Sequence, residues 1–146
     1  MIPPRPLDIS APYSQDDVDT VARTLWAEAR GEGIMGMRAV AHVIQNRVAR
    51  PRWWGRTWRD VCLKPWQFSC WNGDDPNRTL LLRVDFTDAR FRQAFAIAAS
   101  VMAGLDTDDI TSGADHYHAS GVTPAWLDPA KRTGSIGHHI FYKLEA

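Results

Sequence analysis

The run Trp26-Ala27-Glu28-Ala29-Arg30-Gly31-Glu32-Gly33 places a carboxylate at the end of an apolar helical pattern that two glycines interrupt. Ser14, followed three residues later by Asp17, is typical of the start of a helix. Apolar residues then recur at helical spacing and predict one buried face, formed by Val18, Val21, Ala22, Leu25 and Ala29. Gly31 and Gly33 predict the end of this helix, so Glu28 lies in its last turn.

The rest of the chain predicts an α+β domain that is mainly helical, with a small C-terminal β element. A second helix is expected over about 36–49, where apolar residues again recur at helical spacing before Pro51. A short helix is expected at 58–63, and a long one from Thr87 or Asp88 to about Gly104. Short strands are expected at 114–119 and 137–143.

Length and charge limit the classes of protein that this chain can belong to. Its 146 residues predict a single domain over 1–146, with a Pro-rich extended arm at 1–13. A formal net charge of zero argues against nucleic acid as a partner. No apolar run is long enough to span a bilayer, so we expect no stable membrane association, and we expect a monomer. Cys62 and Cys70 could form a disulfide or remain free thiols.

Glu28 is the better of two candidates for a general acid. Burial among apolar side chains disfavours a charged carboxylate and raises its pKa, which makes a proton available near neutral pH. Glu32 lies four residues later on nearly the same helical face, but between two glycines past the predicted helix end. That position suits a solvated carboxylate with a structural or capping role.

A tryptophan-rich connection over 50–80 is a candidate ligand groove. Five of the seven tryptophans fall within it, at Trp53, Trp54, Trp58, Trp66 and Trp71. Such rings either stack on sugars or cover the hydrophobic core. The neighbouring run Gln67-Phe68-Ser69-Cys70-Trp71-Asn72 offers the donors and acceptors that a polyhydroxylated ligand needs.

The histidines raise the alternative of a metal site. His116 and His118 would share one face of a strand, and His138 or His139 could join them around a zinc ion. The spacing is weakly specific, and no His-Glu-x-x-His or Cys-x-x-Cys pattern accompanies it. We therefore expect no metal and no cofactor. His42, in the middle of a predicted helix, is expected to be structural.

Four blocks of the chain, in matching order over roughly residues 18–143, resemble the SleB-type cell-wall hydrolase family. This family comprises the catalytic domains of spore cortex-lytic enzymes and related phage endolysins. The first block is the run that contains Glu28, with Gly36 and the helix Ala39–Val48 that ends in Asn46-Arg47-Val48. The others are Lys64-Pro65-Trp66-Gln67-Phe68-Ser69-Cys70-Trp71, Gly113-Ala114-Asp115-His116-Tyr117-His118-Ala119 and Ile136-Gly137-His138-His139-Ile140-Phe141-Tyr142. The spore enzymes have a Tyr-rich run and an Asn-Pro near 116–120, where only Tyr117 carries over; the phage and proteobacterial branch is more similar there.

The resemblance implies a lysozyme-like fold, related to lytic transglycosylases and resuscitation-promoting factors. It implies that Glu28 is the general acid. The substrate would be the peptidoglycan glycan strand, cut between N-acetylmuramic acid and N-acetylglucosamine. The residues expected to contact the sugars are Gln67, Phe68, Ser69, Tyr117, His118 and Glu32. Unlike the spore enzymes, the chain is expected to carry no separate wall-binding domain.

Two reactions are compatible with Glu28 as the general acid. In a lytic transglycosylase, the muramic C6 hydroxyl attacks the anomeric carbon and a single glutamate suffices. In a muramidase, water attacks with help from a second carboxylate. Turn and capping roles explain the available acids more simply, so transglycosylation is favoured; these acids are Asp60, Asp74, Asp75 and Asp115. The rivals are a zinc amidase or peptidase and a non-catalytic sugar-binding module.

The N-terminal sequence Met1-Ile2-Pro3-Pro4-Arg5-Pro6 lacks the apolar core of a secretory signal. We therefore expect synthesis in the bacterial cytoplasm and action on the cell wall after release. A phage endolysin released by a separate membrane pore-former, a holin, fits this expectation.

Overall fold

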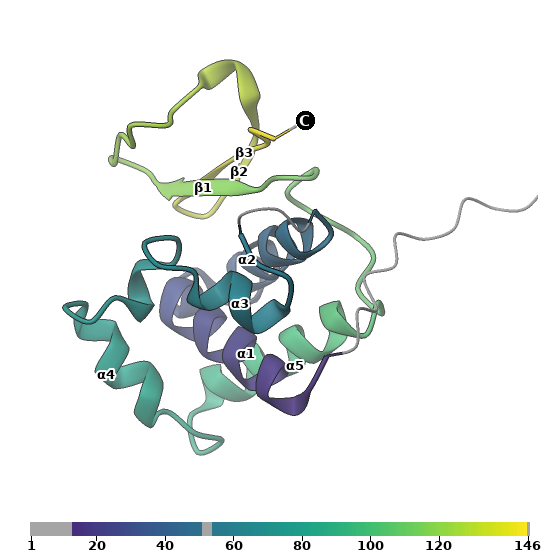
Figure 1. Cartoon of the computed structure of the whole chain (residues 1–146), viewed down its shortest axis with the longest axis vertical. Helices are drawn as coiled ribbons and strands as arrows, with labels where there is room; N and C mark the ends of the chain where they lie inside the picture. The colour runs from purple at the N-terminus through teal and green to yellow at the C-terminus, as the bar shows by residue number, and fades with distance from the viewer. Residues whose placement is uncertain (1–12, 51–53, 146) are drawn as a thin grey trace, which may run out of the picture.

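The computed structural model describes residues 13–50 and 54–145, in which a layer of helices carries a small sheet against one side (Figure 1). The α-helices of this part are α1 (Gln15–Ala29), α2 (Gly33–Val48), α3 (Trp58–Leu63), α4 (Pro76–Arg83) and α5 (Ala89–Met102). Short 3-10 turns are formed by η1 (Arg30–Glu32), η2 (Ser69–Trp71) and η3 (Pro129–Lys131). The strands are β1 (His116–Ala119), β2 (Arg132–Ile136) and β3 (His139–Tyr142). The expected mainly helical α+β class is confirmed.

Local sequence signals set the ends of the first two helices. The Ser14 hydroxyl accepts a hydrogen bond from the Asp17 amide, and the Asp17 carboxylate accepts one from the Ser14 amide, which forms the predicted start of α1. Gly33 has φ 73° and ψ −168°, a conformation open only to glycine, and it allows the chain to turn sharply into α2. Helix α2 therefore begins at Gly33, and the predicted start near Gly36 is wrong by three residues.

One large core joins the helices. Helix α1 packs against α5, α2 and α3, and its buried face includes Leu25, which is fully buried. Trp54 and Trp58 each expose 1% of their surface and belong to this core. Cys62 and Cys70 are free and buried, and burial raises the pKa of the Cys62 thiol to about 12. The tryptophans are thus divided between core and surface, since Trp66 is 79% exposed. Trp53 lies outside the described residues, as does nearly all of the predicted arm at 1–13.

The sheet packs on α2 through a second, smaller core. Its strand order is β1-β3-β2, and both pairs are antiparallel, with Tyr117 opposite Phe141. Phe141 is fully buried against Ala39 and Val43 of α2 and against Ala114. The two predicted strands are confirmed with shorter bounds. Strand β2 was not predicted.

The connection between α2 and α5 contains more structure than the sequence indicated. Besides the predicted α3, it holds α4, which begins at a proline and is capped by the Asp75 side chain accepting from the Asn77 amide. Among the described residues, no helix has the length and apolar character needed to cross a bilayer.

Candidate active site

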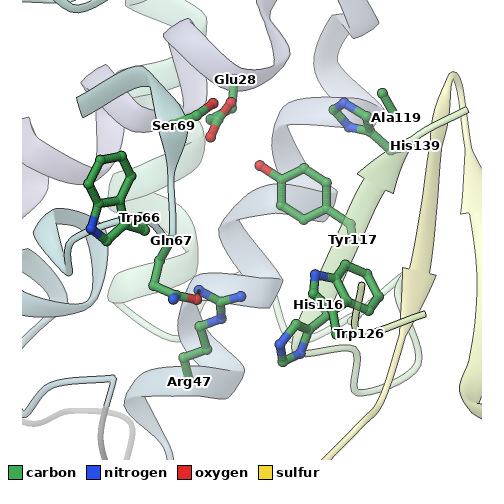
Figure 2. A pocket seen from close by; sticks show the side chains of 10 residues that line it. All are labelled: Glu28, Arg47, Trp66, Gln67, Ser69, His116, Tyr117, Ala119, Trp126 and His139. Carbon is green, nitrogen blue, oxygen red and sulfur yellow. Dashed lines mark hydrogen bonds between the residues drawn. The ribbon is translucent and has the colours of Figure 1, made fainter. Parts of the chain in front are cut away.

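A cleft of about 520 Å³ lies where α1, α2, the segment around η2 and the sheet meet (Figure 2). Its walls therefore come from both the helical layer and the sheet. Its lining residues are Glu28, Arg47, Trp66, Gln67, Ser69, His116, Tyr117, Ala119, Trp126 and His139.

Glu28 lies in the last turn of α1, half-buried, with buried alanines on both sides of it in the sequence. Burial raises the pKa of Glu28 to about 7, and the negative charge of Asp75 adds to the increase. A hydrogen bond from the Tyr117 hydroxyl and the positive charge of Arg47 act in the opposite direction. Figure 2 shows Glu28 beside Ser69, with the Tyr117 hydroxyl pointing toward this end of the cleft. The carboxyl group can therefore both hold and release a proton near neutral pH.

Arg47, on α2, is the buried cation of the site and is 4% exposed. Its Nε donates to the Asp115 carbonyl at 2.8 Å, and its Nη1 lies 3.5 Å from Gln67 Oε1. Its guanidinium also lies over the rings of Trp54 and Phe68, 5.2 and 5.1 Å from their centroids. Burial lowers the pKa of Arg47 to about 10, so it stays charged at neutral pH.

Tyr117 connects the sheet to the acid. Its ring packs against His139 and Phe141, with centroids 4.9 and 5.6 Å away. Burial raises the pKa of the Tyr117 hydroxyl well above its usual value, so the group stays protonated and donates. Trp126 forms another part of the wall, 4.9 Å from His116 between ring centroids.

Residues 31–142 of this chain match the sequence model of a family described as cell wall hydrolase. The chain belongs to the cell wall hydrolase family. The resemblance in the sequence motifs is thereby confirmed. Glu28 lies just before the matched range, so its assignment depends on the geometry of the cleft.

Curated and solved relatives of this cell wall hydrolase come from Bacillus and a related genus. It is 28% identical over 135 residues to a spore cortex-lytic enzyme of Halalkalibacterium halodurans, covering 92% of this chain and 37% of that protein. It is also 28% identical to a spore cortex-lytic enzyme of Bacillus cereus, covering 90% of this chain and 46% of that protein. The chain thus spans less than half the length of these two relatives.

Two solved structures cover nearly the same extent as this cell wall hydrolase. The catalytic domain of the germination-specific lytic transglycosylase SleB from Bacillus anthracis has a TM-score of 0.67 at 27% identity, over 91% of this chain and 98% of that one. The catalytic domain of the Bacillus cereus SleB protein has a TM-score of 0.65 at 27% identity, over 90% and 92%. The expected lysozyme-like fold is confirmed.

Three of the six predicted sugar-contacting residues share the cleft with Glu28, namely Gln67, Ser69 and Tyr117. Phe68 does not: it is 2% exposed, belongs to the helical core and is absent from the described lining of the cleft, so its contact with a sugar stays a prediction. His118 is outside the lining set as well. Its Nε2 lies 2.8 Å from the Tyr142 hydroxyl, and its ring stacks on that tyrosine.

Glu32 is absent from the described lining of the cleft and makes structural contacts elsewhere. Its carboxylate accepts from the His138 amide at 3.0 Å and faces His138 Nδ1 at 3.1 Å. The backbone hydrogen bond lowers the pKa of Glu32, and the side-chain bond adds to this effect. Glu32 thus joins the start of α2 to the β2–β3 turn, which agrees with the structural role favoured for it over acid catalysis.

Five residues that line the cleft were not among the predicted sugar contacts or the tryptophans of the predicted groove, and they are Arg47, His116, Ala119, Trp126 and His139. Arg47 left a readable signal, because it lies between Ile44 and Val48 near the predicted apolar stripe of a helix. No sequence feature indicated Trp126, because its segment resembles a turn and reaches the cleft only when the sheet folds.

The other predicted chemistry is not assembled at the cleft. Over 13–50 and 54–145, no three His, Cys, Asp or Glu side chains are grouped to hold a metal ion. The candidate second acids are absent from the described lining of the cleft, and they are Asp60, Asp74, Asp75 and Asp115. Asp115 accepts from His116 Nδ1 and from the amides of Leu144 and Glu145.

Proposed function

We propose that this protein is a lytic transglycosylase that cuts peptidoglycan between N-acetylmuramic acid and N-acetylglucosamine. The observation that carries the proposal is Glu28, a half-buried carboxyl with a pKa near 7, which is the one acid among the described residues that line the cleft. An acid with this pKa can give up its proton and take one back in a single cycle.

The reaction needs both of those steps from Glu28. The protonated carboxyl donates its proton to the glycosidic oxygen, the bond to the muramic anomeric carbon breaks, and that carbon gains oxocarbenium character. The muramic C6 hydroxyl then attacks the same carbon and gives its proton to the Glu28 carboxylate. A 1,6-anhydro end forms, and the acid is regenerated. Tyr117 stabilises the ionised intermediate state of Glu28 by its hydrogen bond.

The lining of the cleft favours this reaction over hydrolysis. A muramidase that acts through water or a covalent intermediate needs a second carboxylate within about 5–10 Å of the first. No second acid belongs to the described lining of this cleft; Asp75, whose negative charge raises the pKa of Glu28, lies outside that lining and caps α4. The relative from Bacillus anthracis is described as a lytic transglycosylase, which supports the same choice.

The biological setting is part of the proposal. We infer a phage-type endolysin that is made in the bacterial cytoplasm and reaches the wall through a separate membrane pore, the holin. The relatives are described as spore cortex-lytic enzymes, so a role in spore germination is the alternative setting. Induced expression in Escherichia coli with and without a co-expressed holin tests the inference, since lysis is expected only with the pore. Lysis without the pore contradicts holin dependence.

The test of the chemistry uses purified sacculi. We expect the wild-type protein to release soluble fragments that end in anhydromuramic acid, one water lighter than the corresponding reducing ends by mass spectrometry. Glu28→Gln is expected to lower the rate by at least about 10³-fold, since it removes the proton donor. Glu32→Gln, an isosteric change at a carboxylate outside the cleft, serves as the control and retains activity.

Other outcomes identify the rivals. Reducing ends alone indicate a muramidase. Release of free amino groups that stops on chelation indicates a zinc amidase or peptidase. Binding to sacculi without solubilisation indicates a sugar-binding module.

A further inference from the structure

The end of the cleft away from Glu28 carries a positive charge with no paired carboxylate among the described residues. Figure 2 shows Arg47, Gln67 and His116 at this end, with Glu28 and Ser69 at the other. Both ends belong to one cavity, so a single ligand can contact Glu28 and these groups at the same time.

Arg47 is buried without a salt bridge. The ion pairs among the described residues do not include it, although it is only 4% exposed. Its neighbours are the Asp115 carbonyl, the Gln67 amide oxygen and two aromatic rings. Buried charges in proteins are usually paired, because an unpaired one loses its hydration without compensation. An unpaired cation on the wall of a cavity therefore favours an anion within it.

The carbonyl of Asp115 accepts from Arg47, but the carboxylate of Asp115 forms hydrogen bonds with other groups. Its Oδ1 lies 2.8 Å from His116 Nδ1 and accepts from the Leu144 amide at 2.9 Å, while its Oδ2 accepts from the Glu145 amide at 2.9 Å. Asp115 attracts Arg47 electrostatically but forms no ion pair with it. Because its Nδ1–H donates to Asp115, a neutral His116 has only the Nε2 lone pair left, which accepts a hydrogen bond and cannot donate one to a carboxylate.

The neighbouring polar groups complete a donor set. Gln67 Oε1 faces Arg47 Nη1, which leaves the Gln67 amino group to donate elsewhere. A guanidinium presents several N–H groups in one plane, which matches the two oxygens of a carboxylate. Glu28, the one acid of the described lining, is largely neutral below its pKa of about 7 and opposes an anion only weakly there.

We propose that Arg47, together with Gln67, binds a carboxylate carried by the muramic residue of the substrate. The identity of this ligand rests on the proposed function. The carboxylate has two possible sources, the free lactyl group of a muramic acid without a peptide and the acidic residues of an attached stem peptide. Both present the same chemistry to the arginine.

The test measures binding by calorimetry, with Glu28→Gln protein to prevent turnover. The first pair of ligands is a disaccharide repeat of N-acetylglucosamine and N-acetylmuramic acid with a free lactyl acid, and its lactyl methyl ester. The second pair carries the stem peptide, with its carboxylates free or amidated. We expect the charged member of one pair to bind about 10-fold more tightly or better, as for a hydrogen-bonded charge. The pair that shows the difference identifies the source.

Three variants assign the preference to this end of the cleft. In Gln67→Glu, a new negative charge beside Arg47 should abolish or reverse the preference, while Gln67→Met should reduce it much less. Arg47→Lys retains the charge but loses the planar donors, and it should lower the preference several-fold. Because Arg47 is buried, its variant is interpreted only with an unchanged circular dichroism spectrum; the comparison of ligands on Glu28→Gln protein needs no change at Arg47.

Equal affinity within both pairs, or no binding of either acid, overturns the inference. A preference that Gln67→Glu leaves intact also overturns it. These results differ from a failure of the proposed function, which appears as sacculi that stay intact with wild-type protein. An active enzyme that does not distinguish acid from ester refutes only the carboxylate site.

Discussion

In the proposed reaction, Glu28 combines two requirements that conflict in most carboxylates, since it must be protonated at the start and basic at the end. Burial supplies the first, and the hydroxyl of Tyr117 and the charge of Arg47 supply the second by favouring the ionised form. The three groups come from α1, β1 and α2, so the balance exists only in the folded protein. This is why Glu28 could be selected from the sequence, whereas the effect of Arg47 on its pKa became visible only in the folded structure.

The raised pKa of Glu28 predicts a specific dependence of stability on pH. The folded state holds the Glu28 proton up to about pH 7 and the unfolded state only to about pH 4.5, so this group makes stability fall as the pH rises through that window. Glu28→Gln should therefore gain stability over wild type between pH 4.5 and 7, by about 1–3 kcal/mol, and keep that gain above pH 7. Urea unfolding at several pH values measures the difference.

Glu32→Gln is the matched control, with the opposite sign. The pKa of Glu32 is lowered by its bonds to His138, so its carboxylate stabilises the fold at neutral pH and loses this effect as the pH falls. The variant should therefore be less stable than wild type at pH 7 and approach it in acid. A stability difference for Glu28→Gln that does not change with pH contradicts the assigned pKa.

At the scale of the elements, local signals were sufficient for the main helices. The Ser14 and Asp88 caps and the apolar spacing of α1, α2 and α5 are all short-range features. Helix α4 lacked such a pattern. It contains three consecutive leucines, and only Leu81 among them is buried. Strand β2 has the sequence Arg-Thr-Gly-Ser-Ile, which has little strand preference of its own and depends on pairing with β3.

The β2–β3 turn is held against the start of α2 by one glycine and one carboxylate. Gly137 has φ 57°, and a Cβ there would collide with the Glu32 carboxylate. Gly137→Ala is therefore expected to cost at least about 1–2 kcal/mol from the backbone conformation alone, with more from the displaced Glu32. The free energy of unfolding in urea measures the loss.

Gly134→Ala provides the comparison within the same hairpin. A Cβ at Gly134 would meet no heavy atom within 4 Å, and the backbone there is not left-handed. This variant should stay within about 0.5 kcal/mol of wild type. Equal losses for the two alanines argue against the role given to the turn.

At the scale of the whole molecule, the sheet is attached to the helices by a small contact. Phe141 fills it, packed on Ala39 and Val43, while Asn46 donates to the Asp109 carboxylate and the Ala114 carbonyl in the chain that leads into β1. The larger core lies elsewhere, among the helices. The sheet should therefore open more easily than the helical layer.

Phe141→Ala tests this difference. Loss of the buried ring is expected to cost about 3–5 kcal/mol, concentrated in the sheet. Hydrogen exchange should show amides of β1 and β3 losing protection before those of α1 and α5. Leu82→Ala, at a leucine that is 54% exposed, should change neither. A uniform loss of protection across both parts means instead that sheet and helices unfold as one unit.

Glu28 lies where the sheet meets the helices, so its raised pKa depends on contact between these two parts. Its high pKa is produced mainly by burial, and the sheet supplies part of that burial through Tyr117. If the sheet swings away, water reaches the carboxyl group and the pKa drops toward that of an ordinary glutamate. At neutral pH the proton then leaves before any sugar is bound. In the proposed reaction, a molecule whose sheet has moved away from the helices would therefore lack its proton donor at neutral pH.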